Sequence, residues 1–131
     1  MSSEENKRFY QKFQDLQTDL KLDDLDEFMD TYFTLGYIQH NLGPQGNELN
    51  YPAMREAGRQ WYTENHNMHI HVEDILAEGD RVAVRGTTTA IKTATGELES
   101  WDYFCIARIA GGKVAEEWQL VAQVPAKEKT T

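Results

Sequence analysis

The stretch WDYFCIARIAGGKVAEEWQLVAQV, residues 101–124, decides the fold of this chain. Apolar side chains recur at every second position in both halves of the stretch, and AGGK, residues 110–113, forms a tight turn between the halves. A period of two is typical of a β-strand, and a short turn makes consecutive strands pair in antiparallel fashion. The stretch therefore predicts two long strands joined as a hairpin.

Two further strands precede this hairpin. Apolar and polar residues alternate over residues 68–73, and EGD at residues 78–80 turns the chain into RVAVRGTTT, residues 81–89. A turn at residues 95–96 then leads into the hairpin. These turns predict an antiparallel meander of four long strands.

The first part of the chain has helical periodicity instead. Ser2 and Glu5 have the spacing of a capping box, and apolar residues follow at three- and four-residue steps, which predicts a helix over residues 3–20. These apolar residues are Phe9, Phe13, Leu16 and Leu20. A second helix is predicted from Asp23 to Gly36.

The segment HNLGPQGNEL, residues 40–49, carries the Gly and Pro residues of an irregular loop, and Pro52 sits where the first turn of a third helix tolerates it. Helices that come from one end of the chain can cover only one face of the sheet. The pattern as a whole predicts an α+β fold.

The charge balance excludes several classes of partner. The 131 residues include 13 Lys and Arg against 22 Asp and Glu, a formal charge of −9. Such a surface repels phosphate backbones and anionic membranes, so we expect neither nucleic acid nor a membrane as partner. No apolar run approaches the roughly 20 residues of a membrane helix, and the polar N-terminus is unlike a signal peptide. We expect a cytoplasmic protein.

Two features of the sequence are candidates for a reactive thiol or a metal site. The single Cys105 lies in an apolar strand and is predicted to be a buried small side chain. His69, His71 and Glu73 share one face of a strand, as metal ligands could, but the opposite face carries the apolar residues that must be buried. We therefore expect this triplet on the outer surface and predict no metal site.

Three stretches together resemble a known family. They are YIQH at residues 37–40, HVEDILAEGDRVAVR at residues 71–85, and RIAGGKVAEEW at residues 108–118. Their order and spacing resemble the SnoaL-like polyketide cyclase family, within the nuclear-transport-factor-2-like superfamily. The likeness covers roughly residues 20 to 122. It implies a single domain over residues 1–124, followed by a solvated tail over residues 125–131.

The resemblance implies a cone-shaped, curved antiparallel sheet with the N-terminal helices packed on its concave face around a pocket. It also implies a homodimer formed through the outer sheet face. Family cyclases close a ring by intramolecular aldol condensation with an acid–base pair and no cofactor. The early histidine of the family falls on His40, whereas its key carboxylate, four residues after Trp118, is replaced by Ala122.

Three residues are the candidates for catalysis: His40, Glu116 and Asp102. An imidazole titrates near neutrality and suits acid–base work, although a loop histidine can also simply bond the backbone. Counted with a period of two, Glu116 shares the inward face of the last strand with Val114, where it serves as a base or as a structural partner of Arg108. Asp102 is one replacement for the missing family carboxylate, or an exposed residue at a strand start.

Aromatic side chains are the candidates for ligand binding. They are Trp61, Trp118, Tyr32 and Phe104. An aromatic wall suits a small hydrophobic or aromatic molecule, but the same residues could simply fill the core. We predict that His40, Trp61, Glu116 and Trp118 line a single cavity.

Two functions remain open at this stage. In the first, the protein is a cofactor-independent cyclase or isomerase acting on a small carbonyl compound. In the second, it is a non-catalytic member of the same fold that binds a small molecule or serves as a dimeric scaffold. Ala122 favours the second function, and the pair of His40 with an inward Glu116 favours the first.

Overall fold

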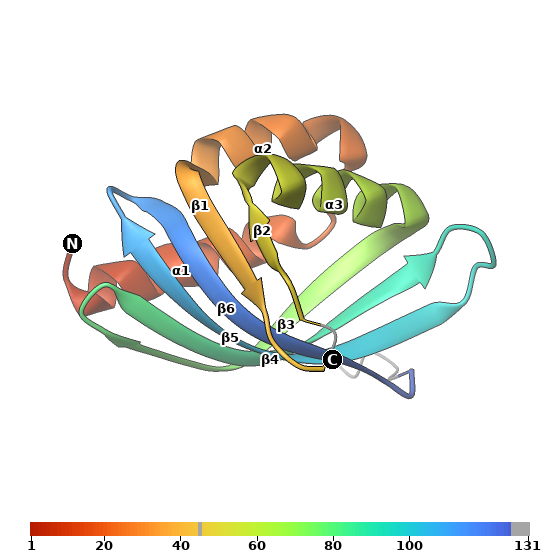
Figure 1. Ribbon diagram of the computed structural model, residues 1–131. Coiled ribbons are helices and arrows are strands. Elements are labelled where there is room, and N and C mark those ends of the chain that lie inside the picture. Colours follow the sequence, from red (N-terminus) through yellow and green to blue (C-terminus); the bar gives the residue numbers. More distant parts are fainter. Residues whose placement is uncertain (45, 127–131) are drawn as a thin grey trace.

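Six strands form one curved, open sheet, and the three α-helices lie on its concave side (Figure 1). The computed structural model describes residues 1–44 and 46–126. In chain order the elements are α1 (Ser3–Gln17), the 3₁₀ turn η1 (Leu22–Asp24), α2 (Leu25–Tyr32), β1 (Phe33–Asn41), β2 (Glu48–Asn50), α3 (Tyr51–Glu64), β3 (Asn65–Glu78), β4 (Arg81–Lys92), β5 (Leu98–Ala110) and β6 (Lys113–Val124). The predicted α+β fold is confirmed.

The strand order is β2-β1-β6-β5-β4-β3. Strands β3 to β6 form the predicted antiparallel meander. Strand β1 pairs with β6 in parallel, so the sheet is mixed rather than antiparallel throughout. This pairing brings the early part of the chain beside the last strand, so residues from both can meet on one face.

The second helix ends earlier than predicted. Strand β1 begins at Phe33, and Gly36 lies inside that strand instead of closing a helix. Phe33 and Tyr37 turn into the core, while the backbone of β1 pairs with that of β6. The expected loop is also shorter than predicted, because β2 pairs with β1 within it. Strand pairing has thus overridden the local helical pattern.

The predicted starts of the first and third helices are correct, whereas α2 begins at Leu25, two residues after the predicted start at Asp23. Ser2 and Glu5 make both hydrogen bonds of the capping box, at 3.0 and 3.1 Å. The Asn50 side chain caps α3, with Pro52 in its first turn. The buried face of α1 differs from the predicted stripe, however. Leu16 is 40% exposed, whereas four other residues of α1 are buried: Asn6, Tyr10, Phe13 and Gln14.

A β-bulge in β6 reverses the expected orientation of that strand. Ile109 pairs with Val114 but Arg108 pairs with Glu116, which leaves Ala115 as an extra residue on β6. An extra residue exchanges the two faces of a strand from that point on. Val114 and Ala115 are consecutively buried, and Glu117 rather than Glu116 then turns inward. From Ala115 on, the odd-numbered side chains of β6 therefore face the concave side.

The core lies between the helices and the concave face of the sheet. It combines aromatic residues of α1 and β1 with small aliphatic residues of β4, β5 and β6. Among the described residues, no helix has the length and apolar character needed to cross a bilayer. Most of the predicted tail, residues 127–131, falls outside the described part of the chain.

The pairing of β3 with β4 predicts a strong effect of Gly86→Ala. A Cβ at Gly86 would lie 2.3 Å from the backbone oxygen of His71 and 2.7 Å from the hydroxyl of Tyr103. We expect a loss of about 2–4 kcal/mol in the free energy of unfolding, because backbone must shift to remove the overlap. Urea denaturation measures the loss. Gly36→Ala is the control, since its Cβ would meet no atom within 4 Å. An equal effect of both substitutions would contradict the structure.

Candidate functional site

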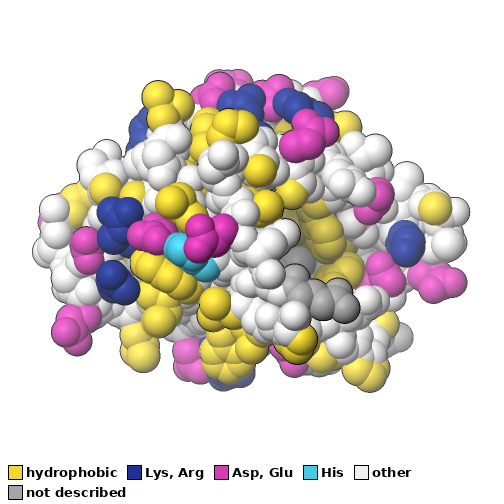
Figure 2. All heavy atoms as spheres, viewed as in Figure 1, with side chains coloured by type: hydrophobic (Ala, Val, Ile, Leu, Met, Phe, Trp, Pro, Cys, Tyr) yellow, Lys and Arg dark blue, Asp and Glu magenta, His cyan; other side chains and the backbone are white. Residues whose placement is uncertain are grey.

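A cavity of about 420 Å³ lies between the helices and the concave face of the sheet. Figure 2 shows a hollow on this side of the molecule, with hydrophobic side chains inside it. The lining comes from α1, α2 and α3 on one side and from β1, β3, β4, β5 and β6 on the other. Its volume is in the range of small-molecule sites.

Glu117 of β6 is the buried carboxyl group of this cavity. Its side chain is 6% exposed and accepts hydrogen bonds at both oxygens. The Tyr37 hydroxyl donates to Oε1 at 2.7 Å, and the Tyr10 hydroxyl donates to Oε2. The Cys105 thiol lies 3.6 Å from Oε2. Three separate elements therefore contact one carboxyl group of a fourth.

Burial raises the pKa of Glu117 above its usual range, because a carboxylate loses its hydration there. Hydrogen bonds from Tyr10, Tyr37 and Cys105 act in the opposite direction and only partly offset the burial. Burial also raises the pKa of Tyr10 and Tyr37, so both hydroxyls stay protonated and remain donors. A buried carboxyl group whose pKa is raised in this way is a candidate for general acid or base chemistry.

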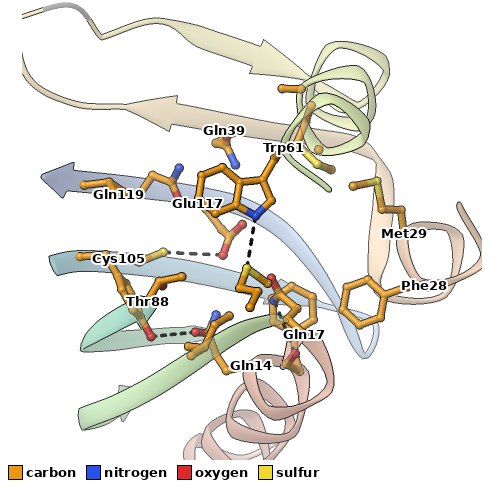
Figure 3. Close-up of a pocket in the computed structure, with 18 of the residues that line it drawn as sticks. Gln14, Gln17, Phe28, Met29, Gln39, Trp61, Thr88, Cys105, Glu117 and Gln119 are labelled. Carbon is orange, nitrogen blue, oxygen red and sulfur yellow. Dashed lines mark hydrogen bonds between the residues drawn. The ribbon is translucent and has the colours of Figure 1, made fainter. Parts of the chain in front are cut away.

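Carboxamide side chains flank Glu117 on the sheet side. Gln39 is its cross-strand partner on β1, and Gln119 lies two residues further along β6, on the same face. The Gln39 amide donates to the Tyr37 hydroxyl at 3.1 Å, which links Gln39 to the carboxyl group. In Figure 3, Gln39, Gln119 and Glu117 lie around the same space.

An aromatic and thioether wall lies at the other side of the cavity. The Trp61 ring of α3 meets the Trp101 ring of β5 edge-on, with 4.9 Å between ring centroids. Its indole N–H points to the Met68 sulfur at 3.3 Å, as Figure 3 shows. Trp61, Trp101 and Met68 all line the cavity. The predicted inward placement of Trp61 is confirmed.

A second polar cluster lies on the convex face of the sheet. His40 Nε2 is 2.6 Å from Glu116 Oε2, and Glu116 Oε1 accepts from Arg108 at 3.2 Å. The other ring nitrogen, Nδ1, is 3.3 Å from Glu48. The hydrogen bond with His40 is the largest influence that lowers the pKa of Glu116. In Figure 2, a histidine side chain lies among acidic and basic side chains, in the same view that shows the hollow.

The prediction that His40, Trp61, Glu116 and Trp118 line one cavity is wrong. Only Trp61 does so. His40 and Glu116 do lie within hydrogen-bond reach of each other, but on the convex face, with the Trp118 ring stacked on His40 at 5.1 Å between centroids. The physical reason is the bulge at Ala115, which turns Glu116 and Trp118 outward. The catalytic roles of His40 and Glu116 stay predictions.

The remaining predicted site residues also lie away from the cavity lining. Phe104 is 58% exposed on the convex face, whereas its neighbours Tyr103 and Cys105 turn inward. Tyr32 packs among the rings of the core instead, 4.9 Å from Phe28 between centroids. Asp102 accepts a hydrogen bond from Thr87 at 3.2 Å and stands directly opposite Ala122. The catalytic role of Asp102 and the ligand-binding roles of the aromatic residues stay predictions.

Two residues of the candidate metal triplet lie on the outer surface, and the third, His69, is partly buried. Met68 is buried and Ile70 packs against the core, whereas His71 and Glu73 are exposed. In the described part of the chain, no three His, Cys, Asp or Glu residues are grouped as metal ligands. Cys105 is buried, as predicted, and burial raises the pKa of its thiol.

Comparison with known proteins agrees with this architecture. A model of the SnoaL-like polyketide cyclase family matches residues 7–128. The chain belongs to the SnoaL-like polyketide cyclase family. A comparison with curated proteins finds no match.

Solved structures share the fold of this SnoaL-like protein. AclR, a candidate hydroxylase from Streptomyces galilaeus, has a TM-score of 0.77 at 23% identity, covering 92% of this chain and 91% of its own. A candidate polyketide cyclase from Acidithiobacillus ferrooxidans has a TM-score of 0.72 at 20% identity, with coverage of 92% and 91%. A protein with a ketosteroid isomerase-like fold from Catenulispora acidiphila has a TM-score of 0.67 at 10% identity, with coverage of 85% and 82%. Identities this low establish the fold alone.

Sequence reasoning missed the residues that form the polar part of the cavity. These residues are Tyr10, Gln39, Glu117 and Gln119, together with Tyr37, whose hydroxyl donates to Glu117 from behind the lining. One signal was present. Asn6, Tyr10, Gln14 and Gln17 repeat at helical spacing along α1, which marks a polar face that a purely apolar count leaves out.

We expect the substitutions of the neighbouring residues Glu116 and Glu117 by Gln to have opposite effects on the free energy of unfolding. The raised pKa of Glu117 means that folding favours its protonated form, so its contribution to stability declines as pH rises from its ordinary value of 4.5 through the folded value. Glu117→Gln should therefore stabilise the protein at pH 8, by about 1–3 kcal/mol, and have little effect at pH 4.

Glu116→Gln is the matched control for this test. Its lowered pKa means that the carboxylate stabilises the fold above pH 4.5 and loses that contribution as pH falls. The Glu116→Gln protein should be the less stable one at pH 8. Thermal denaturation across pH 4–8 measures both effects, and a destabilised Glu117→Gln at pH 8 would count against a strained, buried carboxylate.

Proposed function

We propose that this SnoaL-like protein carries out cofactor-independent acid–base chemistry on a small carbonyl compound, with Glu117 as the group that moves the proton. The observation that carries the proposal is the buried carboxyl group of Glu117 inside a cavity with an otherwise uncharged lining. Its raised pKa suits a general base or acid near neutral pH. Membership of a polyketide cyclase family supports a carbonyl substrate.

The chemistry follows from the donors around Glu117. Its carboxylate takes a proton from the carbon next to a substrate carbonyl, and the electron pair of that C–H bond moves onto the carbonyl oxygen as an enolate. The amide groups of Gln39 and Gln119 are uncharged donors that lie beside Glu117 on the same face of the sheet and can stabilise the charge of that oxygen. In a cyclase the enolate carbon then bonds to a second carbonyl carbon, and Glu117 returns its proton to the resulting alkoxide. In an isomerase the proton returns to another carbon.

The second candidate is a non-catalytic binding protein of the same fold. Ala122, where the resemblance places the carboxylate of the family, favours it. Both candidates use the same cavity and differ in whether Glu117 exchanges protons with the ligand.

We also propose that two copies pair through the convex face of the sheet. No helix covers this face in Figure 1. Cross-strand partners place one row of side chains across it: Leu76, Ala83, Ile106, Trp118 and His40. The neighbouring row holds Arg85, Phe104 and Leu120. Exposed apolar groups beside Arg and Trp residues have the composition of an interface core, and the bordering Arg81 and Glu116 supply both signs of charge.

Proton exchange tests the proposed acid–base role. The methyl protons of 2-acetylnaphthalene in D₂O, followed by NMR, report proton removal next to a carbonyl without requiring the natural substrate. We expect the protein to accelerate exchange and Glu117→Gln to lower the acceleration by at least about 100-fold, the usual size of a general-base effect. His40→Ala is the matched comparison and should retain the activity, because His40 lies on the opposite face. If proton exchange instead depends on His40, the active site lies on the convex face. If the protein does not accelerate exchange at all, the non-catalytic binding protein is favoured.

Leu120→Glu tests the dimer. Leu120 is 46% exposed at the centre of the convex face, and a charge there would be buried in the pair. Light scattering should show a mass of twice 15.1 kDa for the parent protein and 15.1 kDa for Leu120→Glu. Leu22→Glu is the control, since Leu22 is 40% exposed but lies in η1 on the helical side. A monomeric parent protein would refute the pairing.

A further inference from the structure

A chain of hydrogen bonds runs from the Glu117 carboxyl group along the concave face of β1. The Tyr37 hydroxyl donates to Glu117 Oε1 at 2.7 Å, and the Gln39 amide donates to the Tyr37 hydroxyl at 3.1 Å. The side-chain oxygen of Gln39 in turn accepts from the Asn41 amide at 3.3 Å. Side chains at alternate positions of one strand thus connect the carboxyl group to Asn41.

Asn41 joins this chain to β6 and to the segment between β1 and β2. Its side-chain oxygen accepts from the Gln119 amide at 2.8 Å, and Gln119 is also its partner across the two strands. Its amide donates to the Asn47 side chain at 2.8 Å, and its backbone N–H donates to the Asn47 carbonyl oxygen at 2.8 Å. The nitrogen and the oxygen of the Asn41 side chain are therefore both engaged, although Asn41 itself does not line the cavity.

The Tyr37 hydroxyl sets the direction of this chain. A hydroxyl has one proton, and while Tyr37 donates it to Glu117 its oxygen can only accept from its other neighbour. The side-chain nitrogen of Gln39 must then face Tyr37, and its oxygen must face Asn41. Asn41 accordingly turns its nitrogen to Gln39 and its oxygen to Gln119. An amide nitrogen carries two N–H bonds, so Gln39 and Gln119, which both line the cavity, each keep one N–H beyond this chain.

We infer that Asn41 is a positioning residue of the cavity: it holds the amides of Gln39 and Gln119 in the orientation that leaves one N–H of each for a bound molecule. A terminal amide that loses its partner can rotate about its last side-chain bond, which exchanges its nitrogen and its oxygen. The effect of Asn41 on turnover rests on the proposed function, in which these two amides stabilise the charge on the substrate oxygen. Figure 3 shows both amides beside Glu117.

Two substitutions at Asn41 test this role by different routes. Asn41→Asp keeps an acceptor for Gln119 but offers no donor to Gln39, so the Gln39 amide must turn its nitrogen away from Tyr37. Asn41→Leu removes the donor and the acceptor at nearly the same size and without a charge. In the exchange assay with 2-acetylnaphthalene, each variant should lower the maximal rate at least about tenfold and change the half-saturating concentration less than about threefold. An unchanged rate in both variants, or a loss confined to Asn41→Asp, would overturn the inference.

Asn47→Asp is the matched control. It makes the same change from an amide to a carboxylate within the same group of side chains, but it keeps the oxygen that accepts from Asn41. Asn47 is exposed, so its added charge is screened by solvent. The exchange rate of Asn47→Asp should stay within about twofold of the parent protein. A loss as large as that of Asn41→Asp would overturn the inference, because a negative charge in this group of side chains would then account for both results.

A measurement without turnover separates the role of Asn41 from the proposed function. Nuclear Overhauser contacts between the side-chain N–H protons of Gln39 and the ring of Tyr37 report the orientation of the Gln39 amide. We expect these contacts in the parent protein and in Asn47→Asp, and their loss in Asn41→Asp. If the parent protein does not accelerate proton exchange, the proposed function fails and these contacts alone decide the role of Asn41. Their absence from the parent protein, or their persistence in Asn41→Asp, would overturn the inference. Circular dichroism checks that each variant retains the fold.

Discussion

The hydrogen bonds of the Glu117 carboxyl group hold together elements that are far apart in the sequence. Tyr10 comes from α1, Tyr37 from β1 and Cys105 from β5, and all three contact the same carboxyl group of β6. A buried carboxylate without a cation costs several kcal/mol unless donors surround it. The position of α1 over the sheet and the position of β1 beside β6 are thus tied to the requirement to supply those donors. A site that destabilises the fold but is kept fully hydrogen-bonded is typical of function rather than of packing.

Much of the fold was predictable because local rules and tertiary structure agree. The turns at residues 78–80, 95–96 and 110–113 predicted the meander, and Ser2 and Pro52 correctly marked the starts of α1 and α3. The start of β1 was not predictable in this way. Residues 33–36 continue the helical pattern of α2, and only pairing with β6, about 80 residues later, makes them a strand. Local periodicity carries no information about so distant a partner.

The predicted orientation of the site residues was wrong for two physical reasons. One extra residue, Ala115, exchanges the faces of β6, and a period-two count cannot register an insertion in one strand of a pair. Strand β5 is apolar on both faces, with Phe104 and Ile106 outside and Tyr103 and Cys105 inside. Because both faces of β5 carry apolar residues, a period-two pattern in the sequence does not indicate which face is buried. The placement of Trp61 could be predicted because it lies on helix α3, where neither a strand bulge nor a strand with two apolar faces affects the orientation of its side chain.

Adjacent residues with opposite pKa shifts show how the bulge separates two environments. Glu116 turns outward to His40 and Arg108, and its pKa falls; Glu117 turns into the cavity, and its pKa rises. The same distinction bears on Ala122. This residue is exposed, pairs with Asp102 and does not line the cavity, whose acidic group is Glu117. The absence of a carboxylate at Ala122 therefore does not leave the cavity without a carboxyl group, because the bulge at Ala115 has already placed Glu117 there, five residues earlier and on the opposite face of the same strand.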